Sequence, residues 1–351
     1  MRVNNINYRT IIGSKSKNSI QIIDQTELPH NFVLKEIKTL DEVIYSIQRM
    51  WVRGAPLIGV TAAYGFAIAL KESQSDEFIT KVKEKLISAR PTAVNLAWAI
   101  EAIVVHVKRV SPAKRYKEAW SYAEKLAEED IQTNQKIGLH GLDLIKTLKK
   151  NKLNILTHCN AGWLATVDYG TALSPIYHAA ELGIDIHVWV SETRPRNQGS
   201  SLTAWELEQA GIKHTVITDN AAGYLMQKGE VDCVIVGADR ISLDGQVVNK
   251  IGTYLKAVVA YENNIPFYVA APKSTMDAKF ISDNHPFEIE YRCGSEVSQI
   301  TGKLMDGSMS TVSLTTSPVL NPAFDLTPSK YISNIICEDG IFNPSSLKDL
   351  L

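Results

Sequence analysis

The sequence predicts an α/β protein. We expect a Rossmann-like, doubly wound parallel sheet in the C-terminal domain, preceded by a smaller, mostly helical N-terminal domain with a short β ribbon. Beyond Lys150, short β-branched runs alternate with helical stretches, which is typical of a parallel sheet covered by helices on both faces. Before Lys150, apolar residues recur mostly at helical spacing. The 351 residues are enough for two domains, which we place at residues 1–130 and 131–351.

The N-terminal domain begins with short strands and turns, of which residues 20–24 are the clearest run. Helices follow up to the start of the sheet. The uncharged stretch 54–70 is interrupted by glycine and proline and is short for a membrane span, so we predict a buried helix there. Pro91 separates the next two helices, and residues 112–150 have the spacing and charge of amphipathic surface helices.

In the C-terminal domain, strand candidates alternate with helix candidates in chain order. The predicted strands are 154–159, 186–191, 214–218, 233–238 and 267–271. The predicted helices between them are 171–182, 201–210, 220–227 and 249–263. The last sixty residues keep apolar runs such as 331–336, so we expect an ordered extension.

Composition excludes several classes of partner. The chain has 37 basic and 38 acidic side chains, so no global field recruits nucleic acid or an anionic membrane. The four cysteines are far apart and lack metal-ligand or CxxC spacing, which favours a reduced compartment. The first residues have no apolar signal segment. We therefore expect a cytoplasmic protein that binds neither nucleic acid nor membrane.

Several predicted strands end in polar residues. Cys159 follows the first strand and Asp239 the fourth, while 192–198 and 218–219 follow the two strands between. Ligands of open α/β sheets bind beyond the carboxyl ends of the strands, so these groups together indicate a site. Cys159 is either a small buried hydrophobic residue or a thiol that carries a proton or attacks a substrate. Asp239 is either a structural acid or, if desolvated enough to stay protonated, a general acid.

Two further segments are candidates for anion binding. Arg53 and Gly54 precede the helix that Pro56 opens, where free amides and the positive helix end attract phosphate. Asn249 and Lys250 begin the helix predicted after the Asp239 strand, and a lysine opposes the dipole there unless an anion is bound. An ordinary helix start and a solvent-exposed lysine are the alternatives. No strand is followed by G-x-G-x-x-G, so we expect no bound dinucleotide.

Long, ordered motifs in this chain resemble those of the methylthioribose-1-phosphate isomerase family, which shares a superfamily with regulatory subunits of the eukaryotic translation initiation exchange factor. The motifs are 52–56, 88–96, 158–162, 191–199, 218–220, 237–240, 249–254 and 321–325. The resemblance implies an aldose-ketose isomerase without metal or cofactor, acting as a homodimer in methionine salvage. It also implies that Cys159 and Asp239 are catalytic. The substrate-binding residues that it implies are Arg53, Gly54, Ala55, Arg90, Gln198, Asn249 and Lys250.

Some alternatives stay open within this resemblance. Residues 242–248 and 273–292 depart from the family pattern, which leaves 5-deoxyribose 1-phosphate and ribose 1,5-bisphosphate as other substrates. Hydrogen moves from C2 to C1 of the sugar either as a proton through the thiol or as a hydride. A non-catalytic subunit that senses a sugar phosphate is the alternative of another class.

Overall fold

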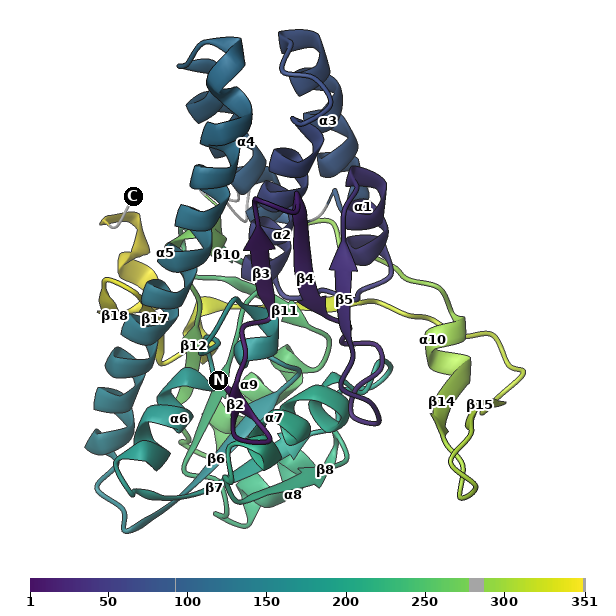
Figure 1. Cartoon of the computed structure of the whole chain (residues 1–351). Coiled ribbons are helices and arrows are strands. Elements are labelled where there is room, and N and C mark those ends of the chain that lie inside the picture. The colour runs from purple at the N-terminus through teal and green to yellow at the C-terminus, as the bar shows by residue number, and fades with distance from the viewer. Residues whose placement is uncertain (92, 278–286, 350–351) are drawn as a thin grey trace.

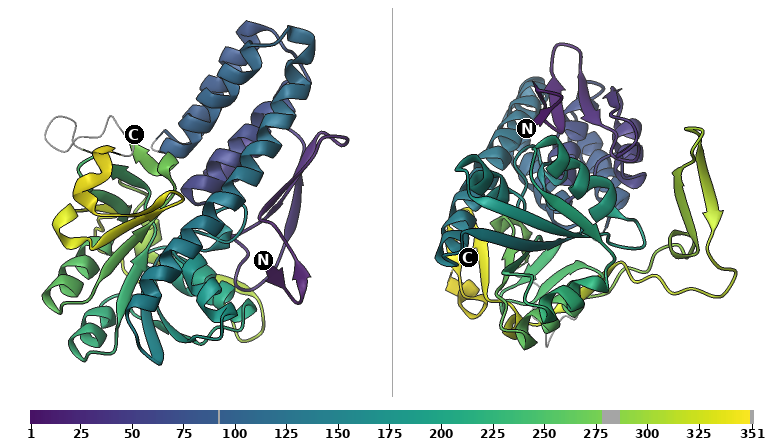
Figure 2. Two further views of the ribbon diagram at one scale, coloured as in Figure 1. Left: turned by 90° about the vertical axis from the view of Figure 1, so that its left-hand side faces the viewer. Right: turned by 90° about the horizontal axis from the view of Figure 1, so that it is seen from below.

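A computed structural model describes residues 1–91, 93–277 and 287–349 (Figure 1). Helices α1 to α4 and a small sheet, β3-β4-β5, lie at one end of the molecule, and a larger parallel sheet lies at the other (Figures 1 and 2). The long helix α5 extends along both parts (Figure 2). The predicted fold class is confirmed.

The helices and strands have the following bounds. The helices are α1 Leu40–Gln48, α2 Ala55–Ala69, α3 Asp76–Ala89, α4 Val94–Lys108, α5 Pro112–Thr147, α6 Ser174–Glu181, α7 Ala204–Gln209, α8 Ala221–Gln227, α9 Thr253–Glu262 and α10 Ser295–Ser298, with a π-helical turn at Gly199–Thr203. The strands are β1 Arg2–Val3, β2 Ile6–Asn7, β3 Ile11–Ser14, β4 Ser19–Ile23, β5 Leu34–Ile37, β6 Lys152–His158, β7 Asp185–Ser191, β8 His214–Ile217, β9 Cys233–Val236, β10 Arg240–Ser242, β11 Val247–Lys250, β12 Phe267–Ala270, β13 Met276–Asp277, β14 Gln299–Lys303, β15 Met309–Ser313, β16 Phe324–Thr327, β17 Asn334–Cys337 and β18 Gly340–Phe342.

The main sheet has seven strands in the order β18-β17-β12-β9-β6-β7-β8. All neighbouring pairs are parallel except β17 and β18. The chain winds outward in one direction from β6 to β8 and in the other direction from β9 to β17. The winding direction therefore changes between β6 and β9, and the crevice at such a switch point is where doubly wound sheets bind ligands.

Both faces of the sheet are buried, as the continuous apolar strands predicted. Along β9, Cys233 and Ile235 pack into a cluster with α5, α6 and α7. Val234 and Val236 pack into a second cluster with α8 and α9. Successive side chains of a strand point to opposite faces, so a strand between two helical layers is apolar at every position.

The helical part is built around α2, which is buried along nearly its whole length, as predicted for residues 54–70. Among the described residues, no helix is both long and apolar enough to cross a bilayer. The amphipathic stretch 112–150 is one continuous helix, α5. Ile131 of α5 packs with the helical cluster and Ile137 with the sheet cluster, so the predicted boundary at residue 130 falls within this helix. The division into two domains stays a prediction.

One predicted helix start is wrong. Asn249 and Lys250 belong to strand β11, which pairs with β10 and β16 in a second, four-stranded sheet, and α9 begins only at Thr253. The apolar pair Val247-Val248 forms an antiparallel ladder before the chain turns into the helix. Lys250 is therefore not at a helix N-terminus, and the predicted conflict between its charge and a helix dipole does not arise.

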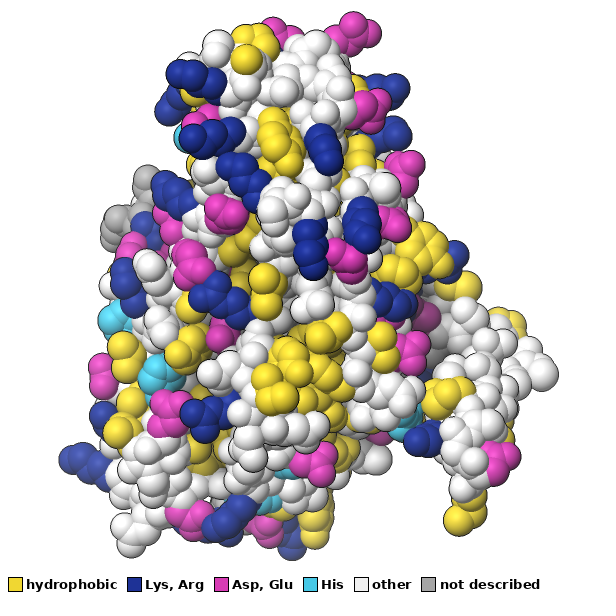
Figure 3. Space-filling model, in the orientation of Figure 1, with side chains coloured by type: hydrophobic (Ala, Val, Ile, Leu, Met, Phe, Trp, Pro, Cys, Tyr) yellow, Lys and Arg dark blue, Asp and Glu magenta, His cyan; other side chains and the backbone are white. Residues whose placement is uncertain are grey.

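Two surface features complete the fold. The β14–β15 hairpin stands away from the body of the molecule (Figures 1 and 2). On the face seen in Figure 3, charged side chains of both signs are intermixed, in line with the net charge of −1. Of the departing stretch 273–292, residues 278–286 lie outside the described part of the chain.

Replacing Ile235 by alanine in the central strand β9 should lower the urea midpoint of unfolding clearly, because the fully buried side chain would leave a cavity that costs about 2–5 kcal/mol. The matched control is Val216→Ala on the edge strand β8, where the side chain is 42% exposed. Equal midpoints for the two variants would contradict the assignment of β9 to the core.

Candidate active site

All nine residues predicted to form a site line one cavity at the switch point, which encloses about 60 Å³. They are Arg53, Gly54, Ala55, Arg90, Cys159, Gln198, Asp239, Asn249 and Lys250. Cys159 follows β6 and Asp239 follows β9, so the thiol and the carboxyl group come from the two strands that flank the switch point. Arg53 and Arg90 reach the cavity from the helical part of the molecule.

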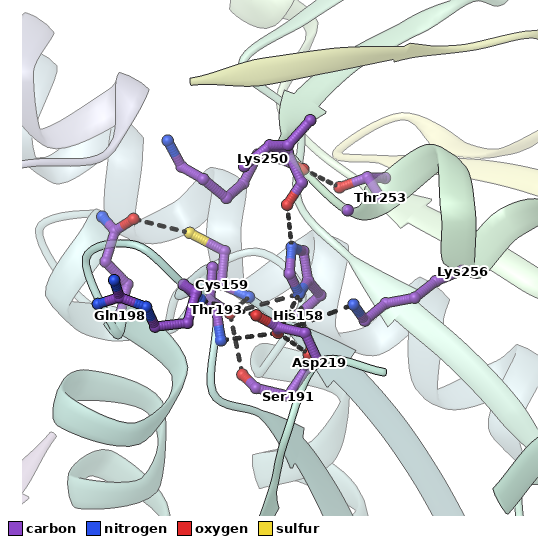
Figure 4. Close-up of polar contacts among 12 residues, drawn as sticks. His158, Cys159, Ser191, Thr193, Gln198, Asp219, Lys250, Thr253 and Lys256 are labelled. Carbon is purple, nitrogen blue, oxygen red and sulfur yellow. Dashed lines mark hydrogen bonds and ion pairs between the residues drawn. The ribbon is translucent and has the colours of Figure 1, made fainter. Parts of the chain in front are cut away.

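The backbone of Cys159 is held in a left-handed conformation, with φ of 64°. Its N–H donates to the hydroxyl of Thr193 at 2.7 Å, and its carbonyl accepts from the hydroxyl of Thr203 at 2.7 Å. The thiol donates to the side-chain carbonyl of Gln198 at 3.4 Å (Figure 4). A non-glycine residue at positive φ is strained, and these contacts hold it in place with its sulfur toward the cavity.

Asp219, which follows β8, organises the segment that carries Thr193. Its carboxylate accepts from the backbone N–H of Thr193 at 2.8 Å, from that of Arg194 at 2.7 Å, and from the hydroxyl of Ser191 (Figure 4). Burial alone would raise the pKa of Asp219, but the Ser191 hydrogen bond and the charge of Lys256 outweigh it, and the pKa is lowered. The site therefore rests on an ionised carboxylate behind Cys159.

His158 lies next to Cys159 and lines the cavity, but both of its ring nitrogens contact groups of the protein. Its Nε2 donates to the carbonyl of Ile251 at 2.8 Å, and its Nδ1 lies 3.1 Å from the hydroxyl of Ser191. Complete burial, with a smaller effect of Lys256, lowers its pKa to about 3. His158 is therefore neutral near pH 7. Its ring contacts connect β6 to Ser191 at the end of β7 and to Ile251 after β11.

A buried chain of polar contacts joins the helical part to the sheet. The guanidinium of Arg53 donates to the side-chain and backbone oxygens of Asn160. The amide of Asn160 in turn donates to Glu206 at 2.9 Å. Glu206 also accepts from the backbone N–H groups of Trp163 and Leu164 at 2.9 and 3.0 Å, so it orders the turn after Cys159. Burial raises the pKa of Glu206 and lowers that of Arg53.

Gly54 precedes the first residue of α2 and is required by its conformation and surroundings. Its φ is 89°, and a Cβ added there would lie 2.3 Å from the backbone oxygen of Ala165. The absence of a side chain lets the N-terminus of α2 approach the segment after β6. Backbone amides at a helix N-terminus attract anions, so anion binding by this segment stays a prediction.

Two further buried cations line the cavity: Lys250, the last residue of β11, and Arg90, which follows α3. The ammonium of Lys250 donates to the carbonyl of Ala323 at 3.0 Å and lies 4.4 Å from the ring centre of Phe324. Burial, and then the charge of Arg292, lowers the pKa of Lys250 to about 8. Burial likewise lowers the pKa of Arg90 to about 10. A cavity with this lining is suited to an anion.

Sequence reasoning missed three contributors. Glu206 lies inside a helix and has no motif that marks it. Arg292 and Phe324 line the cavity, although Arg292 lies in the stretch 273–292 that departs from the family pattern. Phe324 belongs to the matched motif 321–325, so its presence in that motif could have indicated a site residue. In the described residues, no group of three or more His, Cys, Asp or Glu side chains is arranged to hold a metal ion.

Known proteins are similar to this chain over nearly its whole length. The initiation factor 2 subunit family model matches residues 51–344. A methylthioribose-1-phosphate isomerase of Sinorhizobium medicae is 50% identical and covers 100% of this chain and 99% of its own length. The crystal structure of 5-methylthioribose 1-phosphate isomerase from Pyrococcus horikoshii superimposes with a TM-score of 0.84 at 38% identity, over 98% of this chain and 95% of that chain.

A second solved structure has a different title. The translation initiation factor eIF-2B subunit delta from A. fulgidus superimposes with a TM-score of 0.79 at 41% identity, over 96% of each chain. The chain belongs to the initiation factor 2 subunit family, and its full-length relatives place it in the methylthioribose-1-phosphate isomerase family.

Replacing Glu206 by glutamine should destabilise the protein by about 3–5 kcal/mol, because it removes the charge opposite buried Arg53 and puts an NH₂ group among hydrogen-bond donors. The measurement is the urea midpoint of unfolding. The control is Glu208→Gln, an exposed glutamate on the same helix. If both variants unfold at the wild-type midpoint, the buried chain from Glu206 to Arg53 contributes little to stability.

The affinity for sulfate should fall as the pH rises through about 8, because Lys250 loses its proton there and attracts an anion less. Sulfate keeps its double charge in this range, so its own titration does not interfere. Titration calorimetry on both sides of pH 8 measures the effect. Lys250→Arg should flatten the profile. Lys256 also has a pKa lowered to about 8 by burial but does not line the cavity, so Lys256→Met should keep the fall.

Proposed function

We propose that this protein is an aldose-ketose isomerase that converts S-methyl-5-thioribose 1-phosphate to S-methyl-5-thioribulose 1-phosphate. One observation supports the proposal most strongly. A thiol and a carboxyl group from the two strands at the switch point face the same cavity as a cluster of buried cations. The name shared by its full-length relatives supports the choice of substrate.

The reaction requires the sugar ring to open first. In an aldose 1-phosphate the anomeric oxygen is esterified, so no free aldehyde exists from which ordinary enolisation could start. In our proposal Asp239 donates a proton to the ring oxygen, while the Arg53 segment and Lys250 hold the phosphate. A general acid in this position contributes about 10²–10⁴ to the rate.

Hydrogen then moves from C2 to C1, and C2 becomes the ketone. The hydrogen travels either as a proton through Cys159 or as a hydride, with Cys159 stabilising the charge that develops. The proton gained by the ring oxygen is balanced by the one lost from the 2-hydroxyl, so the reaction needs no external oxidant. Solvent deuterium at C1 of the product distinguishes the proton route from the hydride route.

The choice among sugar phosphates rests on the cations of the cavity. Arg53, Arg90, Lys250 and Arg292 all line it. Arg292 and Arg53 both affect the pKa of Arg90, and Arg292 and Arg90 both affect the pKa of Lys250. They therefore form one cluster, which suits one phosphate. A bisphosphate would need a second basic cluster. This supports a 1-phosphate with an uncharged group at C5, and 5-deoxyribose 1-phosphate stays the alternative.

A non-catalytic regulatory subunit is the second candidate, since the similarity to the eIF-2B subunit delta structure reaches 41% identity. The joint presence of Cys159, Asp239 and the cation cluster favours the enzyme. A purified protein that binds these sugar phosphates but turns over none would support the second candidate instead.

The proposal extends to the state of the protein in the cell. We propose a homodimer that works in the cytoplasm without metal or cofactor, as the resemblance implies. Its partner is the sugar phosphate alone. Light scattering of the purified protein tests the dimer, and a monomer at working concentration would contradict it.

A side-by-side assay should give the highest kcat/KM on S-methyl-5-thioribose 1-phosphate, compared with 5-deoxyribose 1-phosphate and ribose 1,5-bisphosphate. Cys159→Ala and Asp239→Asn should each lower kcat by about 10²–10⁴, because each removes a proposed proton-transfer group. Cys233→Ala is the matched control, since this buried cysteine begins β9 and lies outside the cavity lining. A variant of Cys159 or Asp239 with near wild-type kcat would show that its assignment is wrong.

A further inference from the structure

Arg292 lines the cavity and belongs to the segment between β13 and α10, where no motif predicted a site residue. Its side chain is only 8% exposed. Its Nε donates to Glu290 at 2.7 Å, and its backbone N–H donates to Asn321 at 2.9 Å. The side chain is therefore held at a defined place in the cavity lining.

One nitrogen of this guanidinium, Nη2, donates no hydrogen bond within the described part of the chain. The Nη2 atom is also buried. A charged donor that is buried without an acceptor costs more free energy than a neutral one. Arg53, in the same cavity, donates instead to two oxygens of Asn160. An acceptor supplied by a ligand in the cavity would satisfy Nη2.

The ring of Phe324 holds Arg292 beside Lys250. The Lys250 ammonium lies 4.4 Å from the ring centre, and the Arg292 guanidinium carbon lies 5.3 Å from it. Each cation lies over the ring and gains from the negative charge of its face. After burial, the charge of Arg292 is the largest cause of the lowered pKa of Lys250 and of Arg90. An anion between these groups would relieve their mutual repulsion.

We propose that Arg292 is a further substrate-binding residue, whose Nη2 donates directly to the phosphate of the sugar substrate beside Lys250. This inference rests on the proposed function for the identity of the substrate. The chemical class of the ligand, an anion with oxygen acceptors, follows from the cations that line the cavity. The carboxylate of Glu290 accepts from Nε and fixes the orientation of the guanidinium. The Nη2 donor therefore has a defined position as well as a charge.

The test compares Arg292→Met and Arg292→Lys with the unsubstituted protein. Titration with sulfate measures the anion site directly, and kinetics on S-methyl-5-thioribose 1-phosphate measure its use. Arg292→Met should raise the sulfate Kd and the KM about 10- to 100-fold, which corresponds to one charged hydrogen bond. Measuring kcat beside KM separates weaker phosphate binding from a slower chemical step. Arg292→Lys should restore part of the affinity.

The control is Arg115→Met. Arg115 has a comparably buried side chain, 7% exposed, but its Nη1 is held by Asp76 at 2.9 Å, and it does not line the cavity. This variant should bind sulfate normally once circular dichroism shows that it is folded. If Arg292→Met is not folded, Arg292→Lys decides, since it keeps the charge and the apolar stem but loses the Nη2 donor.

The possible outcomes separate this inference from the proposed function. Unchanged sulfate affinity in a folded Arg292 variant would overturn the inference, even if the enzyme turns over the sugar phosphate as proposed. Weakened sulfate binding in a protein that isomerises none of the sugar phosphates would keep the anion site and reject the proposed function. Weakened binding together with a raised KM supports both.

Discussion

The buried chain from Glu206 through Asn160 to Arg53 is the interaction on which the site depends most. Glu206 belongs to the sheet part of the molecule and Arg53 to the helical part, and Asn160 donates to the first and accepts from the second. Each charge is costly to bury alone, because removing its partner leaves an uncompensated charge in a medium of low dielectric. The two parts of the molecule are therefore joined at the point where the cavity forms.

The same chain of contacts orders the backbone at the end of β6. Glu206 accepts hydrogen bonds from the backbone N–H groups of Trp163 and Leu164. The hydroxyl of Thr203, in the preceding π-helical turn, accepts from the side-chain amide of Asn160 and donates to the carbonyl of Cys159. The left-handed backbone at Cys159 persists because its surroundings specify both its N–H and its carbonyl. A thiol on a freely moving loop would not meet Asp239, which comes from the next strand of the sheet. The strain is local, and the core on both faces of the sheet supports it.

The cavity shows a conflict between stability and function. Burial lowers the pKa of Arg53, Arg90 and Lys250, so the fold holds these groups in a place where their charged forms are disfavoured. Evenly distributed surface cations would avoid this cost. Sites that violate the ordinary rules of burial are the places where function is expected, because a bound ligand of opposite charge offsets the cost. A dianionic sugar phosphate is the kind of ligand that this arrangement fits.

The amino-acid sequence was sufficient to predict the fold class and nine of the residues that line the cavity. Short β-branched runs that alternate with helices predicted a parallel sheet, because such a sheet is covered by helices on both faces. Polar residues at the ends of those strands predicted the site, because the carboxyl ends of parallel strands meet at one edge. The strand order, the place of Lys250 on a strand instead of a helix, and the positions of Glu206 and Arg292 at the site came only from the tertiary structure. These depend on contacts between segments far apart in the chain: Glu206 lies 46 residues from Asn160, and a single charged residue carries no periodic signal that reveals its partner.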